Sequence, residues 1–119
     1  MEHTLVDKNG TKYIAGMSGK TFITAEQDIL DFIAHCGDYP TNRILLYEDN
    51  LTKDFFDLKT QLAGKIMQKL ANYSVKAAVV ISARRIQGRF GEMARETKNS
   101  GNVRYFTDQH AAEVWLIKS

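Results

Sequence analysis

Cysteine, proline and tryptophan are scarce in this chain, since each occurs once in 119 residues. The single cysteine, Cys36, cannot form a disulfide within the chain, and the first residues lack the basic, apolar and small-residue order of a signal peptide. We therefore expect a reducing, cytoplasmic location. Long apolar runs are also missing: the stretch 77–81 is one of the longest and is far too short to cross a bilayer. No membrane partner is expected.

A strong charge of either sign is missing as well. Sixteen Lys and Arg residues against fourteen Asp and Glu residues leave a net charge of +2 and a sequence pI of about 8.7. The chain also has no nucleic-acid-binding motif and no platform of aromatic and basic side chains, so a nucleic-acid partner is not expected. The composition, 44% hydrophobic and 25% charged, is typical of a globular protein and predicts one domain over residues 1–119.

Turn signals and apolar periodicity predict five strands and four helices. Asn9-Gly10 supplies the positive φ angles of a tight type I′ turn, so the residues around it predict an N-terminal hairpin. Strands and helices then alternate, which implies crossover connections and parallel pairing. The strands are expected at 3–7, 11–17, 43–47, 75–81 and 102–106, and the helices begin near residues 24, 52, 89 and 108. The expected fold is a single α/β domain with the order β-β-α-β-α-β-α-β-α, in which the continuously apolar strand 43–47 is central.

Residues 51–81 predict one long amphipathic helix followed by an apolar strand. Thr52 is a suitable N-cap, and apolar residues recur after it at spacings of three and four. The stripe consists of Phe55, Leu58, Leu62, Ile66, Leu70 and Tyr73. Such a unit covers a sheet and carries no chemistry by itself.

Two other helices have recognisable caps. Thr24 and Gln27 fit a capping box at the start of the first helix, and Gly37 is expected to end it. Asp108 or Thr107 can cap the last helix. That last helix is expected to hold Ala111, Val114, Trp115 and Ile117.

Five short segments between residues 55 and 80 carry a family resemblance. They are Phe55-Phe56-Asp57-Leu58, Leu62-Ala63-Gly64, Gln68-Lys69, Asn72-Tyr73 and Lys76-Ala77-Ala78-Val79-Val80. Together they resemble a bacterial family known as domain of unknown function 4180, and the likeness runs over most of the chain. This resemblance implies a fold and no activity. The family pattern prefers Gly where this chain has Gln61, which puts the turn at that position in question.

The element order is also similar to that of the STAS fold of anti-sigma-factor antagonists. This similarity is one of topology alone, and it implies a protein-docking module that phosphorylation switches. The STAS switches carry an Asp-Ser-Ser-Gly-like turn before the helix that follows the central strand. In the corresponding region this chain offers only Thr52 and Thr60 as phosphorylation sites.

Two ligand-binding patterns fail on spacing. Gly19-Lys20-Thr21 looks like the end of a P-loop, but the motif needs Gly where Ile14 stands, and two residues separate it from the predicted helix cap. The second pattern is a group of acidic residues near the predicted helix start, which lack the spacing of a calcium loop. Carboxylates gather at a helix N-terminus for electrostatic reasons without any metal. These residues are Glu48, Asp49, Asp54 and Asp57.

No catalytic residue, metal site or cofactor is predicted. His3, His35 and His110 are dispersed along the sequence. Cys36 has no base and orienting group that would complete a nucleophilic site.

Positive charge gathers between residues 84 and 104. Arg84 and Arg85 directly follow the fourth predicted strand, and with Arg89 they would bind a phosphate or carboxylate bidentately. Gly88 and Gly91 would allow a mobile lid over such a ligand. The alternative is an ordinary solvated face. The same segment also contains Arg95, Lys98 and Arg104, against Glu92 and Glu96.

Two functions stay open. The first is a non-enzymatic regulatory or protein-interaction module, whose partner is another protein or a second copy of this chain. Phe55 is expected in the core, and Phe56 either in the core or, with Asp57 and Thr60, on a partner surface. The second function is a small ligand-binding protein or enzyme that holds an anion with the three arginines after the fourth strand. Both surfaces are expected beyond the carboxyl ends of the strands, where open α/β sheets bind ligands.

Overall fold

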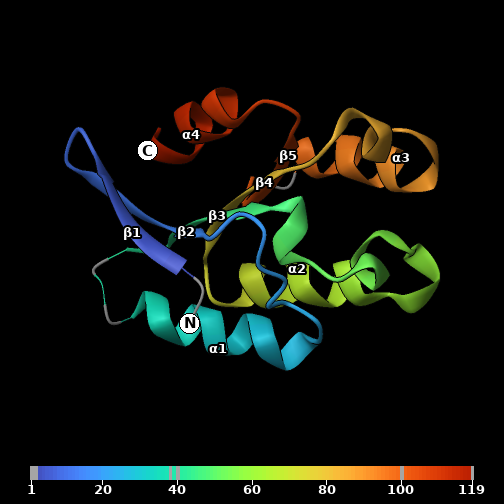
Figure 1. The fold of residues 1–119 in the computed structure, drawn as a ribbon, viewed down its shortest axis with the longest axis horizontal. Helices are drawn as coiled ribbons and strands as arrows, with labels where there is room; N and C mark the ends of the chain where they lie inside the picture. Colours follow the sequence, from blue (N-terminus) through green and yellow to red (C-terminus); the bar gives the residue numbers. More distant parts are fainter. Residues whose placement is uncertain (1–2, 38, 40, 100, 119) are drawn as a thin grey trace.

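Five strands form one sheet in the order β1-β2-β3-β4-β5 (Figure 1). The computed structural model describes residues 3–37, 39, 41–99 and 101–118. Strand β1 pairs antiparallel with β2, and the other three pairings are parallel. The strands are β1 (His3–Lys8), β2 (Thr11–Gly16), β3 (Arg43–Tyr47), β4 (Lys76–Val80) and β5 (Val103–Phe106). The predicted α/β class, the mostly parallel sheet and the central position of the strand 43–47 are confirmed.

The hairpin turn between β1 and β2 is made as predicted. Asn9 and Gly10 have φ angles of 53° and 87°, which are the positive values that a tight hairpin turn requires. Lys8 pairs with Thr11 across this two-residue loop. The edge strand β1 is therefore positioned by the turn, while β2 lies inside the sheet.

Three helices connect the parallel strands and a fourth follows the last strand. They are α1 (Glu26–Cys36), α2 (Leu62–Asn72), α3 (Gly88–Glu96) and α4 (Gln109–Ile117). Each parallel strand is added on the same side of the previous one, so right-handed crossovers place all three connecting helices on one face. Only α4 lies on the opposite face.

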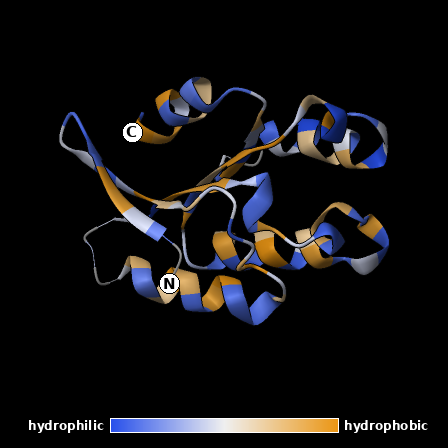
Figure 2. Cartoon of the chain, in the orientation of Figure 1, coloured by the Kyte–Doolittle hydropathy of each residue, from blue (hydrophilic) through white to orange (hydrophobic). Residues whose placement is uncertain are grey.

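The core alternates along the strands between these two faces. Ile44 and Leu46 of β3 pack in the layer of α1, α2 and α3, whereas Leu45 packs against α4. In β4, Val79 joins the first layer and Ala78 the second. Figure 2 shows the central strands as largely hydrophobic and the helices as two-sided. Strands covered on both faces need no polar side, which explains the continuous apolar runs in the sequence.

Hydrogen bonds with side chains stabilise both ends of α4. The carboxylate of Asp108 accepts a hydrogen bond from the backbone N–H of Ala111, which confirms Asp108 as the N-cap. At the other end, Arg43 donates to the carbonyl of Leu116 at 3.2 Å, and Lys76 donates to the carbonyl of Trp115 at 2.8 Å. Cations at a helix C-terminus satisfy free carbonyls and oppose the helix dipole.

The predicted last helix is confirmed, since Ala111, Val114, Trp115 and Ile117 all lie in α4. Ala112 and Leu116 are fully buried against the sheet, whereas Ala111 is exposed and Val114 is 43% exposed. Trp115 and Ile117 flank the buried pair and are half-buried. The buried face of α4 is thus centred on Ala112 and Leu116.

The prediction of a single long helix after residue 51 is wrong. Short 3₁₀ helices precede α2: η1 (Glu48–Asn50), η2 (Lys53–Phe56) and η3 (Leu58–Thr60). Gln61 then adopts a left-handed conformation with φ of 62°, which an α-helix does not allow. The apolar spacing was real, because Phe55, Ile66 and Leu70 are buried. The stripe ends early, however, since Tyr73 is 58% exposed.

The cap of α1 differs from the predicted Thr24–Gln27 box. The helix begins at Glu26, and the carboxylate of Asp28 accepts hydrogen bonds from the N–H groups of Thr24 and Ala25. Gln27 donates instead to Asp31 one turn along the helix. These bonds to charged oxygen hold the pKa of Asp28 below its usual value, with the bond from Thr24 N–H the largest cause.

Candidate functional site

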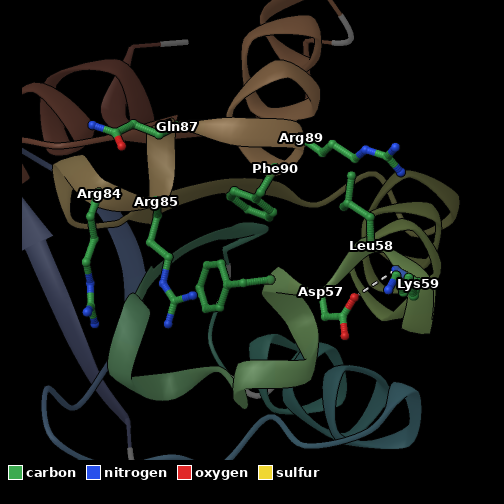
Figure 3. Close-up of a pocket in the computed structure, with 9 residues that line it drawn as sticks. Asp57, Leu58, Lys59, Arg84, Arg85, Gln87, Arg89 and Phe90 are labelled. Atoms are coloured by element: carbon green, nitrogen blue, oxygen red, sulfur yellow. Dashed lines mark hydrogen bonds between the residues drawn. The ribbon is translucent and has the colours of Figure 1, made fainter.

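A cavity of about 420 Å³ lies beyond the carboxyl ends of the central strands, between two segments that are distant in sequence. One wall comes from residues 56–59, which join η2 to η3. The other wall comes from η4 (Ala83–Ile86) and the first turn of α3. The residues that line it are Phe56, Asp57, Leu58, Lys59, Arg84, Arg85, Gln87, Arg89 and Phe90 (Figure 3). The structure thus places the three arginines named from the sequence beside Phe56 and Asp57.

Glu48 organises one side of this cavity. It directly follows β3, and its Oε1 accepts a hydrogen bond of 2.8 Å from the backbone N–H of Ser82, which follows β4. Its Oε2 lies 3.3 Å from Nε of Arg85 and 3.8 Å from Nη2 of Arg84. Burial raises the pKa of this carboxyl, but the bonds from Ser82 and Arg85 outweigh burial and hold the pKa below its usual value. Glu48 is therefore ionised at neutral pH and fixes Arg85.

Arg85 is held on its other side by an aromatic ring. Its guanidinium carbon lies 4.3 Å from the centre of the Phe56 ring, a cation–π contact. Phe56 in turn makes edge-to-face ring contacts, with its ring centre 5.2 Å from that of Phe55 and 5.0 Å from that of Phe90. Phe55 is 2% exposed and lies in the core, as predicted. Phe56 is half-buried, so it contacts the core and lines the cavity at the same time.

Arg84 and Arg89 are the exposed cations of the cavity. The side chain of Arg84 is 78% exposed, and its only contact to an acid among the described residues is the 3.8 Å pair with Glu48. Within the same part of the chain, Arg89 is exposed and its side chain makes no ion pair or hydrogen bond. In Figure 3 Arg84 and Arg85 lie on one side of Phe90 and Arg89 lies on the other. An anion between them would meet guanidinium groups from two directions.

Asp57 and Thr60 are used by the backbone around them. The carboxylate of Asp57 accepts a hydrogen bond from Lys59 N–H and caps η3. The Thr60 hydroxyl lies 2.6 Å from the Asp54 carbonyl and 2.8 Å from the Asp57 carbonyl, and it accepts a hydrogen bond from Leu62 N–H. Both residues are exposed, and Asp57 also lines the cavity. Thr60 therefore joins η2, η3 and the first turn of α2.

Thr52 has a different role from the predicted helix N-cap. Its side chain makes no capping hydrogen bond, and its backbone N–H donates to the Ile23 carbonyl at 3.0 Å. Its own carbonyl accepts from Phe55 N–H at the start of η2. Thr52 is half-buried, in contrast to the exposed Thr60.

The two glycines near the site support close packing and a turn. Gly91 is buried, and a β-carbon there would overlap the carbonyl of Ile86. Gly88 has a φ of 71°, which begins α3 directly after Gln87. Gly91 therefore lets α3 fold back onto η4, which positions Arg85 and Arg89 on one cavity. The sequence suggested a lid at these glycines, but only the packed structure reveals the contact with Ile86.

Asn50 is the residue that sequence reasoning missed. It is a fully buried polar side chain, and it donates to the carbonyls of Met17 and Lys20 at 2.7 and 2.9 Å. Its Oδ1 accepts from Tyr47 N–H at 2.8 Å. Asn50 therefore joins the loop after β2 to the end of β3, next to Glu48. An isolated Asn in a turn-like segment carries no signal that would have revealed this role.

The histidines and acids do not assemble a reactive centre. His3 and His35 are not dispersed in space, because their rings lie 5.4 Å apart at the far end of α1 from the cavity. Cys36 is buried, and burial raises the pKa of its thiol to about 11, which disfavours the nucleophilic thiolate. Among the described residues there is no group of three or more His, Cys, Asp or Glu side chains that could hold a metal ion.

One protein family matches most of this chain. The family described as "Domain of unknown function (DUF4180)" matches residues 8–116. The chain belongs to this family. No curated protein and no solved structure matches the chain. Within the part of the chain that the structure describes, no helix is long and apolar enough to span a membrane. Membership of DUF4180 brings no activity with it, so function has to be argued from the cavity.

Proposed function

We propose that this DUF4180 chain acts in the bacterial cytoplasm as a binding module for a small anionic ligand. One observation carries the proposal: Arg84, Arg89 and Lys59 line one cavity together with Phe56 and Phe90, and among the described residues the only carboxylate that lines it is Asp57. That carboxylate is already engaged by the backbone of η3. The cations therefore lack enough internal counter-charge, and an anion supplies it.

The chemistry of the lining favours a phosphate or a carboxylate group. A guanidinium group binds either one bidentately, through two parallel N–H donors. Arg85 is already held by Glu48 and Phe56, so little side-chain freedom is lost when an anion binds beside it. Phe56 and Phe90 offer apolar surface to the rest of the ligand. A cavity of about 420 Å³ suits a small organic anion.

Calorimetric titration with small anions tests this function. Inorganic phosphate, pyrophosphate, citrate and a nucleoside monophosphate are titrated into the wild type and into the double variant Arg84→Gln with Arg89→Gln. Both arginines are exposed, so we expect that variant to fold normally and to bind any recognised anion at least tenfold more weakly. The matched control is Lys12→Gln with Lys65→Gln, which removes two charges outside the cavity. Equal binding by the two double variants, or no binding of any anion at millimolar concentration, would overturn the proposal.

A regulatory protein-interaction module of STAS-like architecture is the second candidate. It is supported by the exposure of Asp57 and Thr60 beside Phe56, on a 3₁₀ segment that projects beyond α2 (Figure 1). The partner would be another protein or a second copy of this chain. Phosphorylation of Thr60 would remove the hydroxyl proton that joins η2 to η3, and so would change this surface. For this candidate, Phe56→Ala changes the mass of the native particle measured by light scattering, while small anions change nothing.

A further inference from the structure

The basic segment 84–104 is divided between two cavities. The second has a volume of about 380 Å³ and lies between α3, β5 and α4. Arg95, Lys98 and Arg104 line it, whereas the three arginines of the first cavity do not. Helix α3 separates the two sites, because Phe90 lines the first and Ala94 the second. The second cavity is therefore a distinct site that the proposed function leaves unused.

This cavity runs along the free edge of the sheet. Four successive residues of the last strand and its end line it, namely Arg104, Tyr105, Phe106 and Thr107. Side chains alternate between the two faces of a strand, so a cavity on one face would meet only every second residue. Strand β5 pairs only with β4 among the described strands, which makes it an edge strand (Figure 1). Lining by consecutive residues places the cavity at the open edge.

The backbone of Tyr105 points toward this open edge. The N–H groups of Ala77 and Ile81 donate to the carbonyls of Asn102 and Phe106, so the even-numbered residues of β5 face β4. Backbone groups in a parallel strand alternate in direction, which turns the N–H and C=O of Tyr105 outward. No other described segment donates a backbone hydrogen bond to Tyr105 or accepts one from it. The whole residue is only 7% exposed and its side chain packs in the core, so what this residue offers the cavity is its backbone.

The charges around the edge are positive. Lys98 is exposed and makes no ion pair among the described residues, and Arg104 stacks loosely over Phe106 at 5.9 Å. Arg95 donates to the Ile86 carbonyl at 3.2 Å, which keeps its guanidinium at the cavity. The only carboxylate in the lining, Asp108, is occupied as the N-cap of α4. An arriving segment would therefore be selected for negative charge.

We propose that the free edge of β5 binds an extended acidic peptide of a partner protein, which pairs with the sheet as a sixth strand. The outward N–H and C=O groups of Tyr105 supply the backbone hydrogen bonds, and Lys98 and Arg104 select acidic side chains. Ile86 and Ala94, on the face of the sheet covered by α3, receive the apolar side chains that alternate with the acidic ones. A free strand edge accounts for the lining by four consecutive residues, 104–107, better than a small compact ligand does.

The probe is the fluorescent peptide acetyl-(Glu-Val)₄-amide, with two comparison peptides. One is (Lys-Val)₄, and the other is (Glu-Val)₄ with N-methyl groups on alternate residues, which keeps the charge and removes strand pairing from one edge. We expect measurable binding of the acidic peptide, at least tenfold weaker binding of both comparison peptides, and at least fivefold slower hydrogen exchange at Tyr105 N–H in the complex. Equal binding of the N-methylated peptide, unchanged exchange at Tyr105, or no binding at millimolar concentration would overturn the proposal.

Variants separate this site from the first cavity. The double variant Lys98→Glu with Arg104→Glu is expected to bind the acidic peptide at least tenfold more weakly than the wild type and to bind (Lys-Val)₄ more tightly. The double variant Arg84→Gln with Arg89→Gln is expected to bind the acidic peptide as the wild type does. If that second variant lost peptide binding instead, the peptide would belong to the first cavity, and this inference would fail whatever the fate of the small-anion proposal.

Discussion

The backbone N–H of Ser82 donates a hydrogen bond of 2.8 Å to the carboxylate of Glu48, so one side chain ties the segment after β4 to the end of β3. The two residues are 34 positions apart in the chain. The same carboxylate also holds Arg85 at 3.3 Å, so this link reaches the proposed anion site. In that proposal Glu48 is an internal counter-ion with which an incoming anion has to compete.

Glu48→Gln is expected to weaken folding and strengthen anion binding. The amide oxygen still accepts from Ser82, but the charge that pairs with Arg84 and Arg85 is lost, at a cost of about 1 kcal/mol in the free energy of unfolding at pH 7. Released from their counter-ion, the arginines bind any recognised anion several-fold more tightly. Urea unfolding and calorimetry measure the two effects. Glu92→Gln, on the exposed side of α3, is the control and should change neither; weaker anion binding by Glu48→Gln would contradict this role.

Acid destabilisation should depend on the same carboxylate. The pKa of Glu48 is lowered in the folded protein from its usual value of 4.5, so its contribution to stability is complete above that value and is lost as the pH falls through the folded pKa. The unfolding free energy of the wild type should therefore fall below about pH 4.5 more steeply than that of Glu48→Gln. Urea titrations between pH 3 and pH 7 measure both slopes. Equal slopes of unfolding free energy against pH in the two proteins would show that the partners of Glu48 do not stabilise its ionised form.

Asn50→Ala is expected to be among the most damaging single changes. It leaves the carbonyls of Met17 and Lys20 and the N–H of Tyr47 without their buried partner, which costs about 2–4 kcal/mol of unfolding free energy. Asn72→Ala is the matched control, because Asn72 is exposed and bonds only Gln68 one turn away. That control should stay within about 0.5 kcal/mol of the wild type. A similar loss in both variants would contradict the role given to Asn50.

Two glycine-to-alanine changes should have opposite effects on the stability of the chain. Gly91→Ala places a methyl group onto the Ile86 carbonyl, so α3 has to move away from η4 and both stability and anion binding fall. Gly64→Ala, within α2, meets nothing within 4 Å and should add up to about 1 kcal/mol through helix propensity. Thermal unfolding of the two variants measures whether stability falls in Gly91→Ala and rises in Gly64→Ala. A neutral Gly91→Ala would mean that the close approach to Ile86 is not needed.

Gln61→Gly should stabilise the chain by about 0.5–1 kcal/mol, because glycine adopts the left-handed backbone at this position without the steric cost that glutamine meets. The φ angle of Gln61 is 62°, which lies in this left-handed region. Gln68→Gly is the matched control: it makes the same replacement inside α2 and should destabilise by about 1 kcal/mol. A loss of stability in both variants would show that Gln61 makes contacts that outweigh its backbone strain.

The sequence by itself determined the sheet and the order of its elements. Asn9-Gly10 specifies the hairpin through its φ angles, and the apolar run of β3 specifies a central strand because both of its faces are covered. These are local rules, since turn chemistry and alternation act over a few residues. They also placed Arg84 and Arg85 after a strand, and so on the ligand-binding side of the sheet.

Only the tertiary structure decided how the chain breaks and which charges meet. The apolar spacing from Phe55 to Leu70 is nearly the same for a continuous helix and for 3₁₀ turns followed by a helix, so the left-handed Gln61 could not be read from it. The contact of Glu48 with Ser82 and Arg85 joins two strand ends, and α3 divides one basic segment into two sites. Such contacts depend on packing between distant segments, and neither periodicity nor charge counting contains that information.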